Sequence, residues 1–138
     1  MEARNRALPE WLNRVTSGQI RLPRFQRDEA WGHERVAKLL QTVLRGLPAG
    51  ATLVLAVGDK EPFVSRPIVG VPNPTERATE HLLDGQQRLT ALWRSFSDNY
   101  EDRTYFVKFE SEGNGDSGVS VHSQSSMGKK RKAIPRVG

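Results

Sequence analysis

The chain has 138 residues, enough for one domain that buries roughly two-thirds of its surface. It contains no cysteine, which excludes a disulfide framework, a zinc–thiolate site and a cysteine nucleophile. No apolar stretch approaches the roughly 20 residues that span a bilayer, and the N-terminus lacks the apolar core of a signal peptide, so we expect a cytoplasmic protein without a membrane span.

The net charge of +5 is concentrated at the two ends of the chain. Residues 1–50 carry nine basic and five acidic side chains, residues 51–110 seven and nine, and residues 111–138 five and two. A basic N-terminal part favours nucleic acid or another polyanion as a binding partner, but net charge alone is weak support for either. The three histidines, His33, His81 and His122, lack the spacing of metal ligands, so we expect no zinc site.

The first expected element is a helix over Ala7–Thr16, which we expect to cover part of the core. Pro9 suits its first turn and Gly18 suits its C-terminal cap. The apolar residues recur at helical spacing and form one stripe: Leu8, Trp11, Leu12 and Val15.

A short strand is expected next, because Ile20 and Leu22 alternate with polar residues and the pattern ends at Pro23. The loop that follows places two arginines and a glutamine around aromatic residues. Two interpretations stay open for it. It is either a solvated loop anchored by its aromatic side chains, or a source of guanidinium groups that bind phosphate. The residues concerned are Arg24, Phe25, Gln26, Arg27 and Trp31.

His33–Arg45 has the clearest helical pattern, with Gly46 ending it. Its apolar face belongs to the core, and we expect His33 to be a solvated end residue and not a catalytic base. The apolar face of this helix consists of Val36, Leu39, Leu40, Val43 and Leu44. After the helix, the nearly continuous apolar run Thr52–Val57 predicts a central strand.

Regular structure fades over residues 58–79, where four prolines interrupt the chain. One short strand is predicted there from Phe63, Val64, Ile68 and Val69, and the segment is either a lid or a variable insert.

Residues 104–110 predict the last strand. Residues 111–138 are rich in Gly and Ser and predict a disordered tail, whose basic run is either a nonspecific nucleic-acid contact or a solubilising segment. The basic run is Lys129, Lys130, Arg131 and Lys132.

The most informative stretch is a strand, a glycine turn and a helix in succession. His81–Leu83 predicts a buried strand that stops at Asp84 and Gly85, and helical spacing begins at Leu89. Such a turn presents backbone N–H groups and a positive dipole end to an anion, and Arg88 adds a good phosphate partner. The alternative is that Asp84 only caps the helix, which leaves the consecutive Gln86, Gln87 and Arg88 unexplained.

Asp84-Gly85-Gln86-Gln87-Arg88 followed by Leu89-Thr90-Ala91-Leu92 resembles the signature of GmrSD-type restriction endonuclease N-terminal domains, which are related to the ParB and sulfiredoxin fold. The order Ile-x-Leu-Pro-x-Phe-Gln-Arg-x-x-x-Trp over residues 20–31 and the Gly-Leu-Pro-x-Gly turn over residues 46–50 are similar to the same family. Glu29 departs from it, because the family usually has an aromatic residue there. The resemblance covers about residues 7–110. It predicts an α/β (α+β) domain over residues 1–110, with a small mixed sheet and flanking helices, before the tail of residues 111–138.

The resemblance implies an NTP-binding and NTP-hydrolysing regulatory domain of an anti-phage DNA restriction system, which works with an HNH-type nuclease domain. GTP or another NTP is the expected ligand, together with Mg²⁺. Asp84 is the candidate metal ligand, and Gln86 or Gln87 is the candidate for orienting the attacking water. The candidate catalytic residues are Asp84, Gln86, Gln87 and Arg88, and the candidate phosphate-binding residues are Arg24, Gln26, Arg27, Gly85 and Arg88.

Family members are usually much longer, and no paired-histidine nuclease motif follows the signature here. We therefore expect an isolated N-terminal domain, a truncated product or one part of a split system, without nuclease activity of its own. Two alternatives stay open. One is a ParB-like DNA-binding module, in which the same loops grip DNA phosphates. The other is an inactive remnant or interaction protein.

Overall fold

The computed structural model describes residues 2–27, 30–110 and 118–125. The chain divides into two compact units, each described by itself. The first contains Met1–Ala30 and Gly50–Trp93, and the second contains Trp31–Ala49 and Arg94–Gly138. The mixed α+β class predicted from the sequence is confirmed. Within the described ranges, no helix has the length and apolar character needed to cross a membrane.

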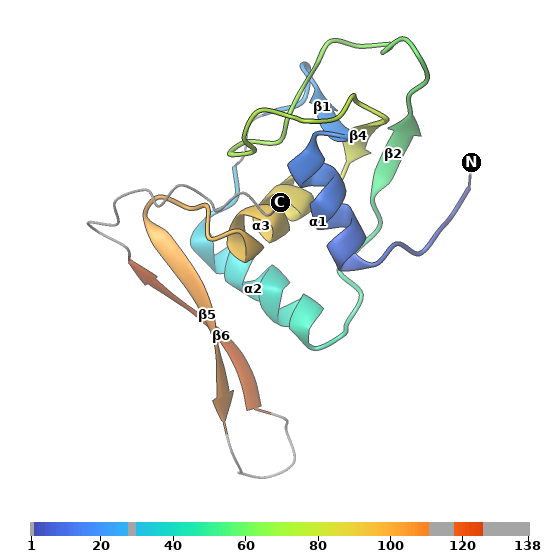
Figure 1. Cartoon of the computed structure of the whole chain (residues 1–138). Coiled ribbons are helices and arrows are strands. Elements are labelled where there is room, and N and C mark those ends of the chain that lie inside the picture. The colour runs from blue at the N-terminus through green and yellow to red at the C-terminus, as the bar shows by residue number, and fades with distance from the viewer. Residues whose placement is uncertain (1, 28–29, 111–117, 126–138) are drawn as a thin grey trace. The chain divides into compact units, whose positions relative to one another are not determined.

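The first unit is built on a four-stranded sheet in the order β2-β4-β1-β3 (Figure 1). The two inner strands, β1 and β4, run parallel, and the outer strands β2 and β3 are antiparallel to their neighbours, so the sheet is mixed as predicted. The strands are β1 (Ile20–Pro23), β2 (Leu53–Ala56), β3 (Ser65–Arg66) and β4 (Glu80–Asp84).

Helix α1 (Leu8–Ser17) and the first part of helix α3 (Gln86–Phe96) share the core of this unit with β1 and β4. Gly18 ends α1 in the left-handed conformation, as its position predicted. The Trp93 indole N–H donates to Thr16 Oγ1 at 3.0 Å and thereby joins the two helices. The buried cluster consists of Val15, Ile20, Leu22, Ile68, Leu82, Leu89 and Trp93.

The second unit contains helix α2 (His33–Leu44) and the two-stranded antiparallel sheet of β5 (Arg103–Glu110) and β6 (Gly118–Ser125). Helix α2 packs against β6. The helix predicted over His33–Arg45 is confirmed within one residue, and three of its apolar positions are buried: Val36, Leu39 and Leu40. Leu44, also assigned to that face, is 42% exposed.

Two strand predictions in the first unit are wrong in position. The apolar run at residues 52–57 forms β2, but β2 is an edge strand with three of its four residues exposed. A continuous apolar run does not separate an inner strand from an outer one, because strand order depends on distant partners. The strand predicted from Phe63 to Val69 is instead the two-residue β3 at Ser65–Arg66.

The prediction of a disordered tail is wrong for Gly118–Ser125, which pair with β5 over its whole length, so β5 is not the last strand. The alternation of Val119 and Val121 with polar residues is too weak to predict a strand alone, and β5 supplies the missing backbone partners. The remainder of the predicted tail, residues 111–117 and 126–138 with the basic run, lies outside the described residues.

Candidate functional site

The predicted strand–turn–helix is present at the end of β4. Gly85 has a φ of +94°, which favours glycine, and its carbonyl accepts the first helical hydrogen bond from Leu89 N–H. Asp84 Oδ1 accepts from Gly85 N–H at 2.8 Å, so the carboxylate stabilises the turn and does not cap the helix. Among the described residues, none accepts a hydrogen bond from the backbone N–H of Gln86 or Arg88. The start of α3 therefore keeps the donors that an anion needs.

Three side chain–backbone hydrogen bonds join this turn to the loop after β1. Gln26 Nε2 donates to Leu83 O at 3.0 Å, and Gln87 Oε1 accepts from Ala30 N–H at 2.9 Å. Gln86, which is buried, donates from Nε2 to Arg27 O. These bonds hold together two motifs that are far apart in the sequence.

The strand register sets how these motifs align. Parallel pairing of Ile20 with Glu80 and of Arg21 with His81 makes β1 and β4 end at the same side of the sheet. Arg24 and Arg27 are both exposed. Within the described ranges, neither guanidinium group has a hydrogen bond or ion pair.

Arg88 closes the site on its other side. Its half-buried guanidinium donates from Nη2 to Ala51 O, in the turn that precedes β2. A Cβ added to Gly50 would lie 3.2 Å from Arg88 Nη1, and one added to Gly85 would lie 3.2 Å from Arg88 Nη2. Both glycines have positive φ values, so the two turns leave room for the guanidinium by having no side chains. Among the described residues, this is the one acceptor that the five N–H donors of Arg88 meet, which leaves donors for an anion.

The exposed Asp84 carboxylate is suitable for Mg²⁺, which takes one or two carboxylates and completes its shell with water and phosphate oxygens. Groups of three or more metal-ligating side chains are absent from the described part of the chain. The two glutamine side chains behave differently from their predicted use, because both form hydrogen bonds that hold the loop. Gln86 bonds through Nε2, so its Oε1 can accept a hydrogen bond from water without giving up that bond.

Sequence analysis missed a polar cluster in the middle of the same sheet. His81 on β4 is completely buried, and its Nε2 lies 2.9 Å from Glu61 Oε1, which also accepts from Ser65 Oγ. The hydrogen bonds from Ser65 and then from His81 lower the pKa of Glu61. The signal in the sequence is a histidine directly before the apolar pair Leu82 and Leu83, but its partner lies 20 residues away.

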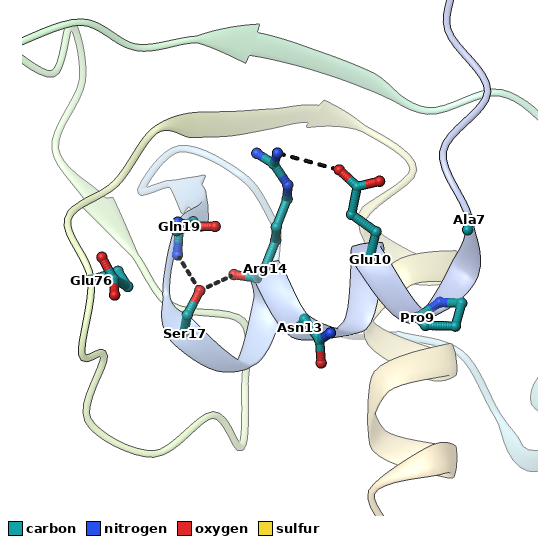
Figure 2. Close-up of a pocket in the computed structure, with 8 residues that line it drawn as sticks. All are labelled: Ala7, Pro9, Glu10, Asn13, Arg14, Ser17, Gln19 and Glu76. Atoms are coloured by element: carbon teal, nitrogen blue, oxygen red, sulfur yellow. Dashed lines mark hydrogen bonds and ion pairs between the residues drawn. The ribbon is translucent and has the colours of Figure 1, made fainter. Parts of the chain in front are cut away.

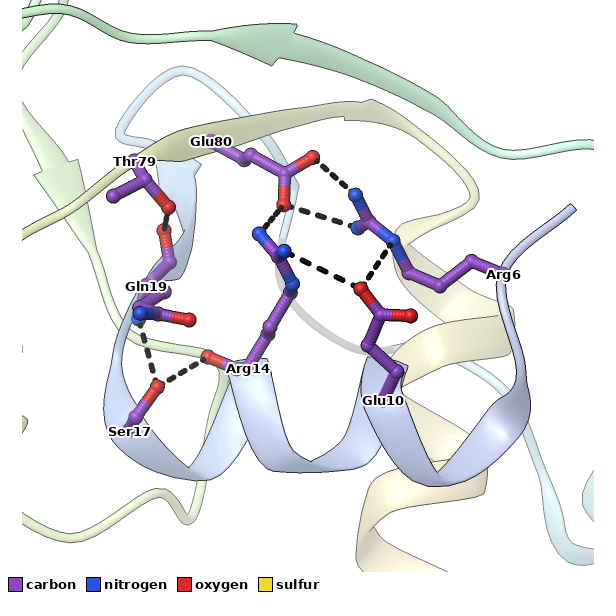
Figure 3. Close-up of polar contacts among 7 residues, drawn as sticks. All are labelled: Arg6, Glu10, Arg14, Ser17, Gln19, Thr79 and Glu80. Atoms are coloured by element: carbon purple, nitrogen blue, oxygen red, sulfur yellow. Dashed lines mark hydrogen bonds and ion pairs between the residues drawn. The ribbon is translucent and has the colours of Figure 1, made fainter. Parts of the chain in front are cut away.

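The start of β4 carries an ion-pair network that was also not predicted (Figure 3). Arg6 donates to both carboxylate oxygens of Glu80 at 3.0 Å, and Arg14 donates to Oε1 at 2.8 Å. Glu10 completes the network with contacts to both arginines at 3.6 and 3.3 Å. Because Glu80 is only 8% exposed, these pairs neutralise a carboxylate that water does not reach.

An open depression of about 580 Å³ lies along α1 and contains none of the predicted site residues (Figure 2). Some of its polar groups are already engaged, since Arg14 binds Glu10 and Ser17 Oγ accepts from Gln19 N–H while donating to Arg14 O. We therefore place the candidate site at the end of β4 and not in this depression.

In the second unit, His33 differs from the solvated end residue that was predicted. Its Nδ1 lies 2.8 Å from Tyr105 Oη and its Nε2 lies 3.0 Å from Asp102 Oδ2. The hydrogen bond from His33 lowers the pKa of Asp102. Tyr100 packs edge-on against both the His33 and Tyr105 rings. The group joins the start of α2 to the start of β5.

The first unit is therefore an α+β domain in which a glycine turn leads from the end of β4 into α3. The chain belongs to the family of GmrSD restriction endonuclease N-terminal domains, which matches residues 8–134. It is 32% identical over 100 residues to an uncharacterized protein of Methanocaldococcus jannaschii, in an alignment that covers 67% of this chain and 17% of that relative. The chain thus spans about a sixth of the relative's length. No solved structure matches the chain, and the likeness to the ParB fold stays a prediction.

Proposed function

We propose that this domain binds a nucleoside triphosphate with Mg²⁺ and hydrolyses it to regulate a DNA restriction system in the cytoplasm. The observation that carries the proposal is the joining of the two family motifs around the start of α3. Arg88 and the loop that carries Arg24 and Arg27 adjoin the start of α3, where the backbone N–H groups of Gln86 and Arg88 have no acceptor among the described residues. Phosphoryl transfer depends mainly on positioning and charge neutralisation, which these groups supply.

In this proposal Asp84 holds Mg²⁺ between its carboxylate and the phosphate oxygens, and Arg88 neutralises charge that develops on the transferred phosphoryl group. Gln86 and Gln87 hold the loop in the free protein. When the nucleotide binds, one of these amides orients the attacking water. The nuclease that this domain regulates, of the HNH type, lies outside these 138 residues in a further domain or subunit.

The test is a thermal-shift titration with GTP, ATP, CTP and UTP, with and without Mg²⁺. A ligand at about 100 times its Kd adds roughly 2.7 kcal/mol of apparent stability, which is a shift of several degrees in a chain of this size. We expect Arg88→Ala to abolish the shift and Asp84→Asn to abolish its dependence on Mg²⁺. Arg45→Ala is the matched control, since Arg45 is an exposed arginine of the second unit.

A shift that survives in Arg88→Ala would remove the phosphates from this turn. No shift with any nucleotide in the wild-type chain would reject nucleotide binding by this domain. Turnover of the bound nucleotide is then measured as phosphate release, where Asp84→Asn should fall to the background rate while melting like the wild type.

The exposed arginines at residues 24 and 27 favour one second candidate, a DNA-binding module in which they contact backbone phosphates. Such binding weakens steeply with salt, by a slope close to the number of phosphates neutralised. Affinity for duplex DNA that falls with salt and is reduced by Arg24→Ala and Arg27→Ala, in the absence of any nucleotide effect, would favour this candidate.

A further inference from the structure

Two phenylalanines of the first unit meet at the surface of the protein. Phe25 is 65% exposed and Phe63 is 41% exposed, yet their rings pack edge to face with centroids 5.3 Å apart. Val64, also 65% exposed, extends the apolar surface. Large apolar side chains that adjoin one another at the surface indicate a binding site, whereas single exposed ones are ordinary. We call Phe25 and Phe63 the aromatic platform.

The sheet topology places the aromatic platform beside the signature turn. Pro23 at the end of β1 pairs with Ser65 at the start of antiparallel β3, so Phe25 and Phe63 both lie beyond that end of the pair. Arg24 N–H donates to Val64 O at 2.9 Å and joins the two loops. The loop that carries Phe25 is hydrogen-bonded to the end of β4 and to the start of α3, through Gln26 to Leu83 O and through Gln86 to Arg27 O.

Side chains beneath the platform hold it in place. Glu61 accepts hydrogen bonds from buried His81 and from Ser65, which fixes the loop on both sides of Phe63. The Phe63 ring also lies 6.2 Å from the His81 ring. Gln26, next to Phe25, is bound to Leu83 O. A surface preorganised in this way loses little entropy when it binds a ligand.

The charges around the platform indicate the kind of ligand. Arg24 and Arg27 flank Phe25 in the chain, are exposed, and have no acidic partner within the described ranges. A ligand that fits must present a flat apolar face and carry negative charge. A nucleotide combines the two, because bases stack on aromatic rings and phosphates bind guanidinium groups.

We propose that the aromatic platform stacks the nucleobase of the nucleoside triphosphate whose phosphates bind at the Asp84–Arg88 turn. The inference rests on the proposed function and adds the base subsite to it. Every base has a π-face, so stacking of this kind discriminates weakly among bases. The domain should accordingly accept more than one nucleoside triphosphate.

The experiment compares Phe25→Ala and Phe63→Ala with Phe109→Ala, a control at an 81% exposed phenylalanine of β5 in the second unit. Each variant is titrated with ATP, GTP and inorganic tripolyphosphate in the presence of Mg²⁺. Loss of one stacking partner should weaken binding of both nucleotides by about 5- to 150-fold. Binding of tripolyphosphate should not change. Phe25→Trp, which keeps an aromatic ring at this position, should retain the nucleotide affinity of the wild type.

The choice of ligands distinguishes a failure of the base subsite from a failure of the proposed function. Unchanged nucleotide affinity in both platform variants would overturn the base subsite and leave the phosphate site standing. An equal loss for tripolyphosphate would also overturn it, because the phenylalanines would then act by positioning the loop. Binding of neither nucleotide nor tripolyphosphate by the wild-type chain would defeat the proposed function and the platform together. If that chain instead bound oligothymidylate through Phe25, the surface would belong to single-stranded nucleic acid.

Discussion

The two ends of β4 use charge in opposite ways. At its start, the Glu80 carboxylate is buried and shares its oxygens among hydrogen bonds from Arg6 and Arg14 (Figure 3). At its end, Asp84 is exposed and bonds only locally to Gly85, while neighbouring arginines point to no acidic partner in the described residues. Charges that neutralise one another contribute to folding, whereas charges kept apart at a turn are available to a ligand.

The first prediction tests the closed end of β4 by removing the neutralised carboxylate of Glu80. Glu80→Ala leaves two partly buried guanidinium groups without their partner, so we expect the free energy of unfolding to fall by about 3 kcal/mol. Urea denaturation measures it. Glu10→Ala is the control, because Glu10 is half exposed and should cost under about 1 kcal/mol. Equal losses in the two variants would show that burial of Glu80 adds nothing.

The second prediction concerns the open end. Gly85→Ala places a Cβ 3.1 Å from Thr52 Oγ1 at a φ of +94°, so we expect a loss of about 1–2 kcal/mol from the strained backbone. Because the same change displaces Arg88, nucleotide-dependent stabilisation should be lost beyond what the destabilisation explains. Gly58→Ala, where an added Cβ meets nothing within 4 Å, should be neutral in both measurements. A Gly85→Ala protein that binds nucleotide normally would contradict the site.

The smallest effect is expected from Glu61, which is bound to His81 in β4, and it concerns how stability depends on pH. Its pKa is lowered in the folded state by hydrogen bonds from Ser65 and His81, so the ionised form stabilises the fold. This contribution is present above about pH 4.5 and is lost as the pH falls through the lowered pKa. Glu61→Gln should flatten the fall in urea midpoint at acidic pH. Asp59→Asn, at a fully exposed carboxylate, should leave the curve unchanged.

Much of the fold was predictable because its signals are local. Apolar residues at helical spacing gave α1, α2 and α3, and glycine at residues 18 and 85 marked the end of one helix and the turn before another. The family was predictable from three motif blocks, and the matching region of residues 8–134 confirms it. The resemblance assigned Gln26 and Gln87 to one candidate site, but it did not predict their hydrogen bonds to Leu83 O and Ala30 N–H.

The sequence by itself determined which segments are helical, where the chain turns, and which residues form the candidate site. Only the tertiary structure decided that β2 is an edge strand, that Gly118–Ser125 pair with β5, and that Glu80 and His81 have acid–base partners. The reason is physical. Helix spacing and turn residues act over a few positions, whereas strand order and buried charge pairs depend on residues tens of positions away, whose identity no local pattern records.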